Sequence, residues 1–368
     1  MWIRVFFISY GMTRSYFQAF MFLRKIIGSK KNLLQDNPIN KLIKVDGKYY
    51  WDQYHAGFPG RSFDNDIKWL LQKEKDGDLT GNTLRFVMLA ITKKCPLNCE
   101  HCYEWDEINQ KEVLSPDELN QIVSKYQDLG ATQFFLGGGE PLSRFNDLLV
   151  LLQNSSDHSD FWLSTSAYNL TFDKAKALKK AGLTGVIISL DHFSEKKHNQ
   201  FRGNQRSFEY VIEGCVHAES AGLVVSLSVC TTRSFVSKEN LYSYLKLGEE
   251  LNVGFIQLVE PRAEGRYGGK DVELREKEYK ILDDFYLTVN NQSKYAQYPK
   301  IVHPSFDQRK FGCAGAGSNF IMIDTDGRIN ACPFCRKKGS HALDRDLSSH
   351  LHEIAAEGCY KFDDRIKN

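Results

Sequence analysis

Three cysteines fall within eight residues of one another: Cys95, Cys99 and Cys102, in the segment CPLNCEHC. A 4Fe-4S cluster normally takes four thiolates. The next cysteine along the chain is Cys215, so the segment supplies three thiolates and leaves one iron open to another ligand. The spacing therefore predicts a loop that wraps an iron-sulfur cluster with one reactive iron. A zinc knuckle is the alternative, but His101 adjoins Cys102 and is badly placed to bind the same ion.

A glycine run, GGGEP at residues 137–141, lies further along the chain. Backbone without a Cβ can approach a ligand closely. The cysteine triplet together with this run resembles the radical S-adenosylmethionine (radical SAM) superfamily, over roughly residues 84–359. The resemblance implies that a 4Fe-4S cluster on Cys95, Cys99 and Cys102 binds SAM. It also implies reductive cleavage of SAM to a 5′-deoxyadenosyl radical, which abstracts hydrogen from a substrate.

The same resemblance indicates which residues bind SAM: His101, Gly138, Gly139, Glu140, Ser189, Asp191 and Arg202. The backbone of Gly138, Gly139 and Glu140 would meet the methionine end. His101 takes the place of an aromatic residue that lies against the adenine, and Ser189 and Asp191 would reach the ribose. Arg202 would pair with the SAM carboxylate through its planar guanidinium.

Strand and helix patterns alternate after residue 84, which favours parallel βα units. Strands are expected over residues 84–92, 133–136, 161–164, 185–190, 223–230 and 254–259, with helices over residues 115–129, 146–153, 171–181, 207–221 and 237–251. Ser115, Pro116 and Glu118 form a capping-box start for the first helix. Six such units resemble the partial (β/α)6 TIM-like barrel of radical SAM enzymes, in which functional loops follow the strands.

Three regions are predicted: an N-terminal extension over residues 1–83, the radical SAM core over residues 84–284, and a small cysteine-rich α+β domain over residues 285–368. Aromatic residues crowd residues 46–72, which suggests a packed lead-in strand and turn. In the last region, Asp326-Gly327 is expected to turn a hairpin between residues 320–323 and 328–331.

Four cysteines fall in the last region: Cys313, Cys332, Cys335 and Cys359. Four thiolates saturate one 4Fe-4S cluster. The C-x13-G-x4-C spacing through Gly327 resembles the auxiliary-cluster domain called SPASM, or Twitch in its shorter form. A structural zinc on the same thiolates is the competing interpretation. Cys215 and Cys230 have no partner at a ligand spacing and are expected to be buried structural thiols.

The first 28 residues are apolar but interrupted by Arg4, Arg14, Arg24 and Lys25. A helix that spans a membrane needs about 20 uncharged residues, so none is expected here. Residues 16–27 have the helical spacing of a surface helix, which predicts peripheral contact with an anionic membrane. Docking on the barrel is the alternative, and Met12 is an alternative start of the chain. Clustered cysteines without a signal peptide predict a reducing, cytoplasmic location.

The charges nearly balance, with 48 Lys and Arg against 46 Asp and Glu, so nucleic acid is not expected as a partner. The resemblance implies an electron donor such as flavodoxin or ferredoxin. It also favours a peptide or protein substrate, with oxidation or rearrangement of a small molecule (a sugar or cofactor precursor) as the alternative. A non-catalytic metal-binding scaffold is a third reading. Four charged residues near the sixth strand are candidates for substrate contact: Glu260, Arg262, Glu264 and Arg266.

Overall fold

The computed structural model describes residues 1–33, 41–76 and 84–313, together with residues 315, 319–336, 339–344, 346, 349, 351, 353, 354, 359 and 362. The side chains of residues 27–33, 74–76 and 311 lie outside this description. The end of the predicted surface segment, residues 27 and 28, is therefore described as backbone only.

One nine-stranded sheet forms the centre of the molecule, in the order β11-β10-β3-β4-β5-β6-β7-β8-β9. Its strands are β3 (Phe86–Thr92), β4 (Gln133–Gly138), β5 (Asp160–Thr165), β6 (Leu183–Ser189), β7 (Val224–Cys230), β8 (Phe255–Val259), β9 (Lys300–Val302), β10 (Phe320–Ile323) and β11 (Ile329–Asn330). Neighbours from β10 to β9 are parallel, and only β11 runs antiparallel within this sheet. The predicted α/β fold with a partial TIM-like barrel is confirmed, and β3 to β8 are the six expected strands.

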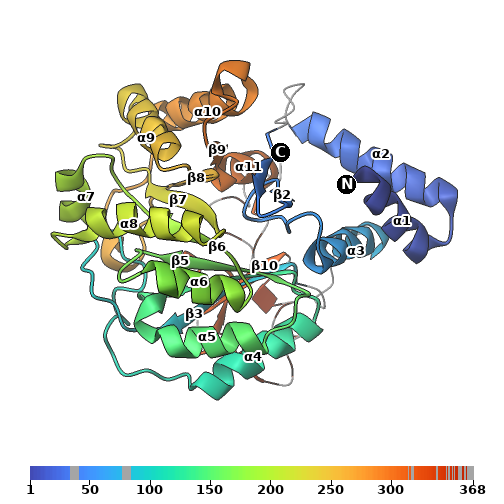
Figure 1. Ribbon diagram of the computed structural model, residues 1–368, viewed down its shortest axis with the longest axis horizontal. Helices are drawn as coiled ribbons and strands as arrows, with labels where there is room; N and C mark the ends of the chain where they lie inside the picture. The colour runs from blue at the N-terminus through green and yellow to red at the C-terminus, as the bar shows by residue number, and fades with distance from the viewer. Residues whose placement is uncertain are drawn as a thin grey trace.

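Helices surround the sheet on its outer side (Figure 1). They are α4 (Pro116–Asp128), α5 (Phe145–Asn154), α6 (Phe172–Lys180), α7 (Glu195–Arg202), α8 (Ser207–Ser220), α9 (Lys238–Glu250), α10 (Glu276–Asn291) and α11 (Pro304–Phe311), with short 3-10 turns η1 (Pro141–Arg144), η2 (Gly265–Tyr267) and η3 (Ser293–Tyr295). The capping box of α4 forms as expected: the Glu118 amide donates to Ser115 Oγ at 3.2 Å, and the Ser115 amide donates to Glu118 Oε2 at 2.9 Å. α7 was not expected, because its polar sequence EKKHNQFR has no apolar repeat.

Two apolar layers hold the barrel together. Alternate residues of each strand face outward, and Val87, Leu89 and Ile91 of β3 pack there in the large cluster that includes Ile122 of α4. The other residues face inward, where Phe86 belongs to a second, aromatic cluster. The period-2 alternation of strands thus supplies both layers from one sequence.

The start of the chain closes one end of the barrel. Hairpin β1 (Ile43–Val45) and β2 (Lys48–Tyr50) contributes Tyr50 to the inner cluster, beside Trp162. Gln53 Nε2 donates to Gln257 Oε1 at 2.5 Å. This interior is filled at the beginnings of the strands, so its accessible part lies toward their ends. The expectation of a lead-in strand and turn over residues 46–72 was incomplete, because helix α3 (Arg61–Asp76) occupies its second half.

The C-terminal hairpin extends the same sheet. β10 pairs with β3 in parallel register, from Phe320 opposite Phe86 to Ile323 opposite Leu89. Because parallel strands end at the same edge, the turn after β10 meets the loop after β3. The boundary predicted between residues 284 and 285 falls inside α10, so it does not divide the chain between elements.

Helices α1 (Trp2–Thr13) and α2 (Tyr16–Leu33) pack with α3 beside the barrel (Figure 1). Val5, Phe22 and Phe63 form the centre of their small core. The outer face of the pair is apolar and exposed: Trp2, Ile3, Phe7, Tyr16, Phe17, Phe20 and Met21. None of the described helices is long and apolar enough to cross a membrane.

Candidate active site

The cysteine triplet follows β3 at the end of the barrel where the strands finish. The glycine run ends β4, and Gly138 stands opposite Thr92 in the parallel pairing. Beyond this pair, the Gly139 amide donates to Thr92 O at 2.8 Å and the Glu140 amide to Lys94 O at 2.7 Å. The structure therefore brings the two predicted motifs side by side.

This close approach requires glycine. A Cβ on Gly139 would lie 2.4 Å from the carbonyl oxygen of Lys94 and 3.2 Å from Cys95 Cβ. Both distances are shorter than ordinary carbon contacts, so any larger residue would push the cysteine loop away. The glycine run thus fixes where the loop begins.

The Glu140 side chain turns away from the cysteine loop and is 1% exposed. Its carboxylate accepts hydrogen bonds from Thr165 Oγ1 at 2.6 Å, from the Ser166 amide at 2.8 Å and from the Leu142 amide at 3.0 Å. The side chain joins the ends of β4 and β5. Only its backbone remains in the place predicted for SAM contact.

Asp191 and Arg202 form a buried pair behind the cysteine loop. Arg202 Nε donates to Asp191 Oδ2 at 2.6 Å, and Arg202 Nη1 lies 3.6 Å from Cys99 Sγ. Burial raises the pKa of Asp191, but the charge of Arg202 outweighs it and leaves the pKa below its ordinary value. Arg202 thus links the end of the β6 unit to one of the three thiols.

His101 stacks on Phe201, with ring centroids 4.7 Å apart and planes 26° apart. Burial lowers its pKa to about 4. Its Nδ1 is buried and has no hydrogen-bond partner among the described residues. A neutral imidazole with an unused nitrogen fits the predicted position against a nucleobase.

Residues 89–244 match the Radical SAM superfamily. This match starts in β3, includes both motifs and ends in α9. Over these residues the chain is a member of the radical SAM superfamily. It is therefore an enzyme, and its cofactors are a 4Fe-4S cluster and SAM.

The names of the proteins that resemble this radical SAM enzyme point to different kinds of substrate. GTP 3′,8-cyclase of Alkaliphilus oremlandii is 28% identical over 273 residues, which cover 69% of this chain and 82% of the relative. Streptococcus suis SuiB bound to the precursor peptide SuiA aligns with 95% of this chain and 79% of its own, with a TM-score of 0.60 at 15% identity. The structure of native anSMEcpe with bound AdoMet aligns with 74% of this chain and 82% of its own, with a TM-score of 0.55 at 17% identity. At these identities the structural likenesses show a shared fold.

The thiols of the radical SAM loop fit a metal cluster. Burial raises the pKa of Cys95 to about 12 and that of Cys102 to about 11, with Cys99 adding to both shifts. Thiols with pKa values this high do not become thiolates at neutral pH unless a cation is present. The donor chemistry therefore suits iron that binds and deprotonates them.

A segment after β8 holds the other side of the cysteine loop. The Arg266 amide donates to Cys102 O at 3.0 Å, and Arg266 Nη1 donates to Asn98 O at 2.9 Å and Cys99 O at 3.0 Å. Gly265 has a φ of 55°, and a Cβ there would lie 2.4 Å from Cys102 O. This contact was not predicted from the sequence, in which Arg266 was only a candidate for substrate contact.

The other charged residues near β8 lie in different surroundings. Glu260 is 1% exposed at its side chain and pairs with His303 at 3.2 Å, with Arg309, and with Arg262 at 3.7 Å. Glu264 is half-buried at the start of η2. The structure thus assigns Glu260 and Arg262 to a buried ion network, in place of the expected substrate contact.

Small polar side chains face the barrel interior above the aromatic cluster. Ser189 of β6 stands opposite Ser228 of β7, which stands opposite Gln257 of β8, and all three are partly exposed. In β5, Ser164 lies two residues after Trp162, so it faces the same way and is exposed. The predicted Ser189 therefore lies in a row of neutral hydrogen-bonding groups.

The second cysteine group also assembles. The thiol of Cys313 hydrogen-bonds to that of Cys359, and the thiol of Cys335 to those of Cys332 and Cys359. These contacts raise the pKa of Cys313 and Cys335 and lower that of Cys332. No group of three His, Cys, Asp or Glu side chains among the described residues is arranged to hold a single metal ion. Cys215 and Cys230 are buried free thiols, as expected.

Proposed function

We propose that this radical SAM enzyme abstracts hydrogen from a peptide or protein substrate and carries a second, fully thiolate-bound 4Fe-4S cluster. The observation that supports it best is a three-thiol loop after β3 together with four free cysteines in the segment that carries the β10–β11 hairpin of the same sheet. The first arrangement leaves one iron for SAM. The second leaves none, which suits electron transfer over substrate binding.

Cys95, Cys99 and Cys102 would hold the first cluster, which together with SAM supplies a 5′-deoxyadenosyl radical. The backbone at Gly138, Gly139 and Glu140 would receive the methionine end. His101, Ser189 and Asp191 would orient the nucleoside end, and Arg202, which pairs with Asp191, would meet the SAM carboxylate. That radical would take a hydrogen atom from a substrate carbon, giving 5′-deoxyadenosine and a substrate radical. The electron for cleavage would come from flavodoxin or ferredoxin.

The polar groups of the barrel interior favour a neutral substrate. Ser164, Ser189 and Ser228 offer hydroxyl groups, which can hydrogen-bond a peptide backbone. Four arginines that follow the strands are paired with carboxylates: Arg144 with Asp147, Arg202 with Asp191, Arg233 with Asp271, and Arg262 with Glu260. A triphosphate needs cations that are free to meet it.

A nucleotide substrate is the second candidate, favoured by the relatives named GTP 3′,8-cyclase. GTP would then undergo a radical rearrangement in this enzyme. Mass spectrometry after anaerobic incubation with GTP, SAM and reductant separates the two candidates. A new GTP-derived product would replace the peptide proposal.

Anaerobic reconstitution followed by reduction with SAM tests the proposed chemistry. We expect 5′-deoxyadenosine from the wild type and none from Cys99→Ala, because two thiolates cannot hold the cluster in place. Cys215→Ala is the matched control, since this thiol is buried in α8 away from the loop. A wild-type chain that yields no 5′-deoxyadenosine would contradict the proposal.

We also propose that the α1–α2 pair contacts the surface of an anionic membrane. Its outer face combines exposed Phe7, Phe17 and Phe20 with exposed Arg24 and Lys25. The first acidic residue of the sequence is Asp36, so no carboxylate on the pair opposes an anionic surface. Apolar and cationic groups on one helical face are typical of helices that lie in the membrane interface.

A further inference from the structure

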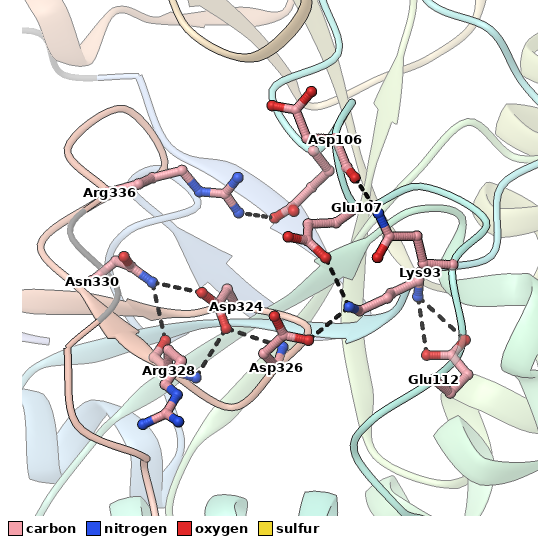
Figure 2. Close-up of polar contacts among 11 residues, drawn as sticks. Lys93, Asp106, Glu107, Glu112, Asp324, Asp326, Arg328, Asn330 and Arg336 are labelled. Carbon is pink, nitrogen blue, oxygen red and sulfur yellow. Dashed lines mark hydrogen bonds and ion pairs between the residues drawn. The ribbon is translucent and has the colours of Figure 1, made fainter.

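Two ion pairs join the radical SAM loop to the C-terminal hairpin. Lys93 Nζ contacts Glu107 Oε2 at 2.8 Å within its own loop and Asp326 Oδ1 at 2.6 Å in the turn after β10. Figure 2 shows Lys93 between these two carboxylates. The Lys93 side chain is 3% exposed. A buried ammonium that loses one partner is costly, so both contacts matter for its position.

The second pair joins the neighbours of two cysteines. Arg336, next to Cys335, donates through Nη2 to Glu104 Oε1 at 2.5 Å and through Nη1 to Tyr103 O at 3.2 Å. Glu104 follows Cys102 by two residues and is 1% exposed at its side chain. Its other oxygen has no hydrogen-bond partner among the described residues. Arg336 is therefore the cation that balances this buried carboxylate.

Both sides of this contact are held by hydrogen bonds. In the hairpin, Asp324 accepts from the Asp326 amide at 3.0 Å and the Arg328 amide at 2.9 Å, which fixes the turn. In the loop, the Asn109 amide donates to Lys93 O at 2.7 Å, and the Asn109 side chain bonds both backbone groups of Cys95 at 3.0 Å. A shift of the hairpin is thus transmitted to the cysteine segment.

We propose that Asp326 and Arg336 are positioning residues for the SAM site, which makes the C-terminal hairpin part of that site. This inference rests on the proposed function for its SAM readout. The pair of Arg336 with Glu104 couples the second cysteine group to the first. A disturbance at either group should therefore be felt at the other, through contacts that require no change in the thiolate ligands.

The test compares reconstituted full-length chains by two measurements. The first is hydrogen exchange of the amides of residues 103–109. The second is SAM affinity, read from the change that SAM causes in the electron paramagnetic resonance signal of the reduced cluster. For Arg336→Gln we expect faster exchange and roughly tenfold weaker SAM binding, the usual scale for losing a residue that supports metal ligands. Iron per chain should stay at the wild-type value.

The double variant Glu104→Gln/Arg336→Gln should recover most of the SAM affinity, because no unbalanced carboxylate remains buried.

Asp326→Asn should weaken SAM binding less than Arg336→Gln does, since Lys93 keeps its ion pair with Glu107. Arg328→Gln is the matched control: Arg328 lies exposed on the same hairpin, and both readouts should match the wild type.

The inference would be overturned if Arg336→Gln showed the hydrogen exchange and SAM affinity of the wild type. It would also be overturned if the double variant bound SAM no more tightly than Arg336→Gln. If the wild type itself does not respond to SAM, the proposed function fails. Hydrogen exchange still decides the inference in that case, because it reports the loop without SAM.

Discussion

At the scale of single residues, Arg202 connects most of the predicted SAM site. It reaches Asp191 with one nitrogen and Cys99 with another, at 2.6 Å and 3.6 Å. Only a planar fork with several donors can make both contacts at once. Because Arg202 is buried, its charge acts on the thiol with little screening by water.

Replacing Arg202 by Lys should weaken SAM binding roughly tenfold or more, since a single ammonium cannot reach both partners. Iron content and fold should be retained. SAM titration followed by the cluster signal measures the effect. Arg206→Lys is the control, because Arg206 is an exposed arginine of the same region that pairs with Glu209. Unchanged SAM affinity in Arg202→Lys would show that the guanidinium has no role at this site.

At the scale of elements, the α1–α2 pair differs from every helix that covers the sheet. The covering helices bury one apolar face against the strands, whereas this pair buries a small core and leaves aromatic residues outside. Ile3 is 75% exposed and Phe17 is 73% exposed. An exposed apolar face of this kind usually marks an interaction surface.

We expect the full chain to sediment with vesicles that contain anionic lipid, and to bind neutral vesicles less. The double variant Phe17→Ser/Phe20→Ser should bind vesicles more weakly. Burying apolar surface contributes about 25 cal/mol of binding free energy per Å², and the variant has less apolar surface to bury in the membrane. Added salt should also lower it. Val216→Ser is the control, as Val216 is an exposed apolar residue on α8. A full chain that stays in the supernatant with anionic vesicles would exclude the membrane contact.

At the scale of the whole molecule, the second cysteine group is tied to the barrel through the sheet. β10 and β11 continue the sheet at β3 and place the hairpin beside the cysteine loop. The four thiols of this group come from positions well separated along the chain, from Cys313 to Cys359. A metal that binds all four would therefore cross-link the C-terminal region and stabilise its fold.

Cys332→Ala should remove about four irons per chain and lower the melting temperature, because a 4Fe-4S cluster is lost from its ligands. The first cluster should remain, so SAM should still change its signal. Metal analysis of the wild type and the variant measures this directly. About one zinc per chain, lost in the variant with no change in iron, would replace the second cluster by a structural zinc site.

The sequence predicted the parts of the site that are close together in the chain. Cys95, Cys99 and Cys102 lie in one loop whatever the rest of the fold does, and the alternating patterns identified the six strands. Gly138 and Gly139 could be paired with this loop only through resemblance to a family. α7 and α1 were not predicted, since the sequence of the first has no apolar repeat and the apolar residues of the second were interpreted only as a candidate membrane span.

The amino-acid sequence by itself determined the three-thiol loop, the helix caps and the alternation of strands and helices, because these depend on neighbours a few residues apart. Tertiary structure alone decided that β10 pairs with β3 and that Arg336 forms an ion pair with Glu104. It also decided that Arg266 hydrogen-bonds the backbone of the cysteine loop, and that Cys359 contacts Cys313 and Cys335. Such contacts depend on which distant surfaces bury each other when the sheet closes. That choice is made by the packing of the whole chain, and no short segment contains it.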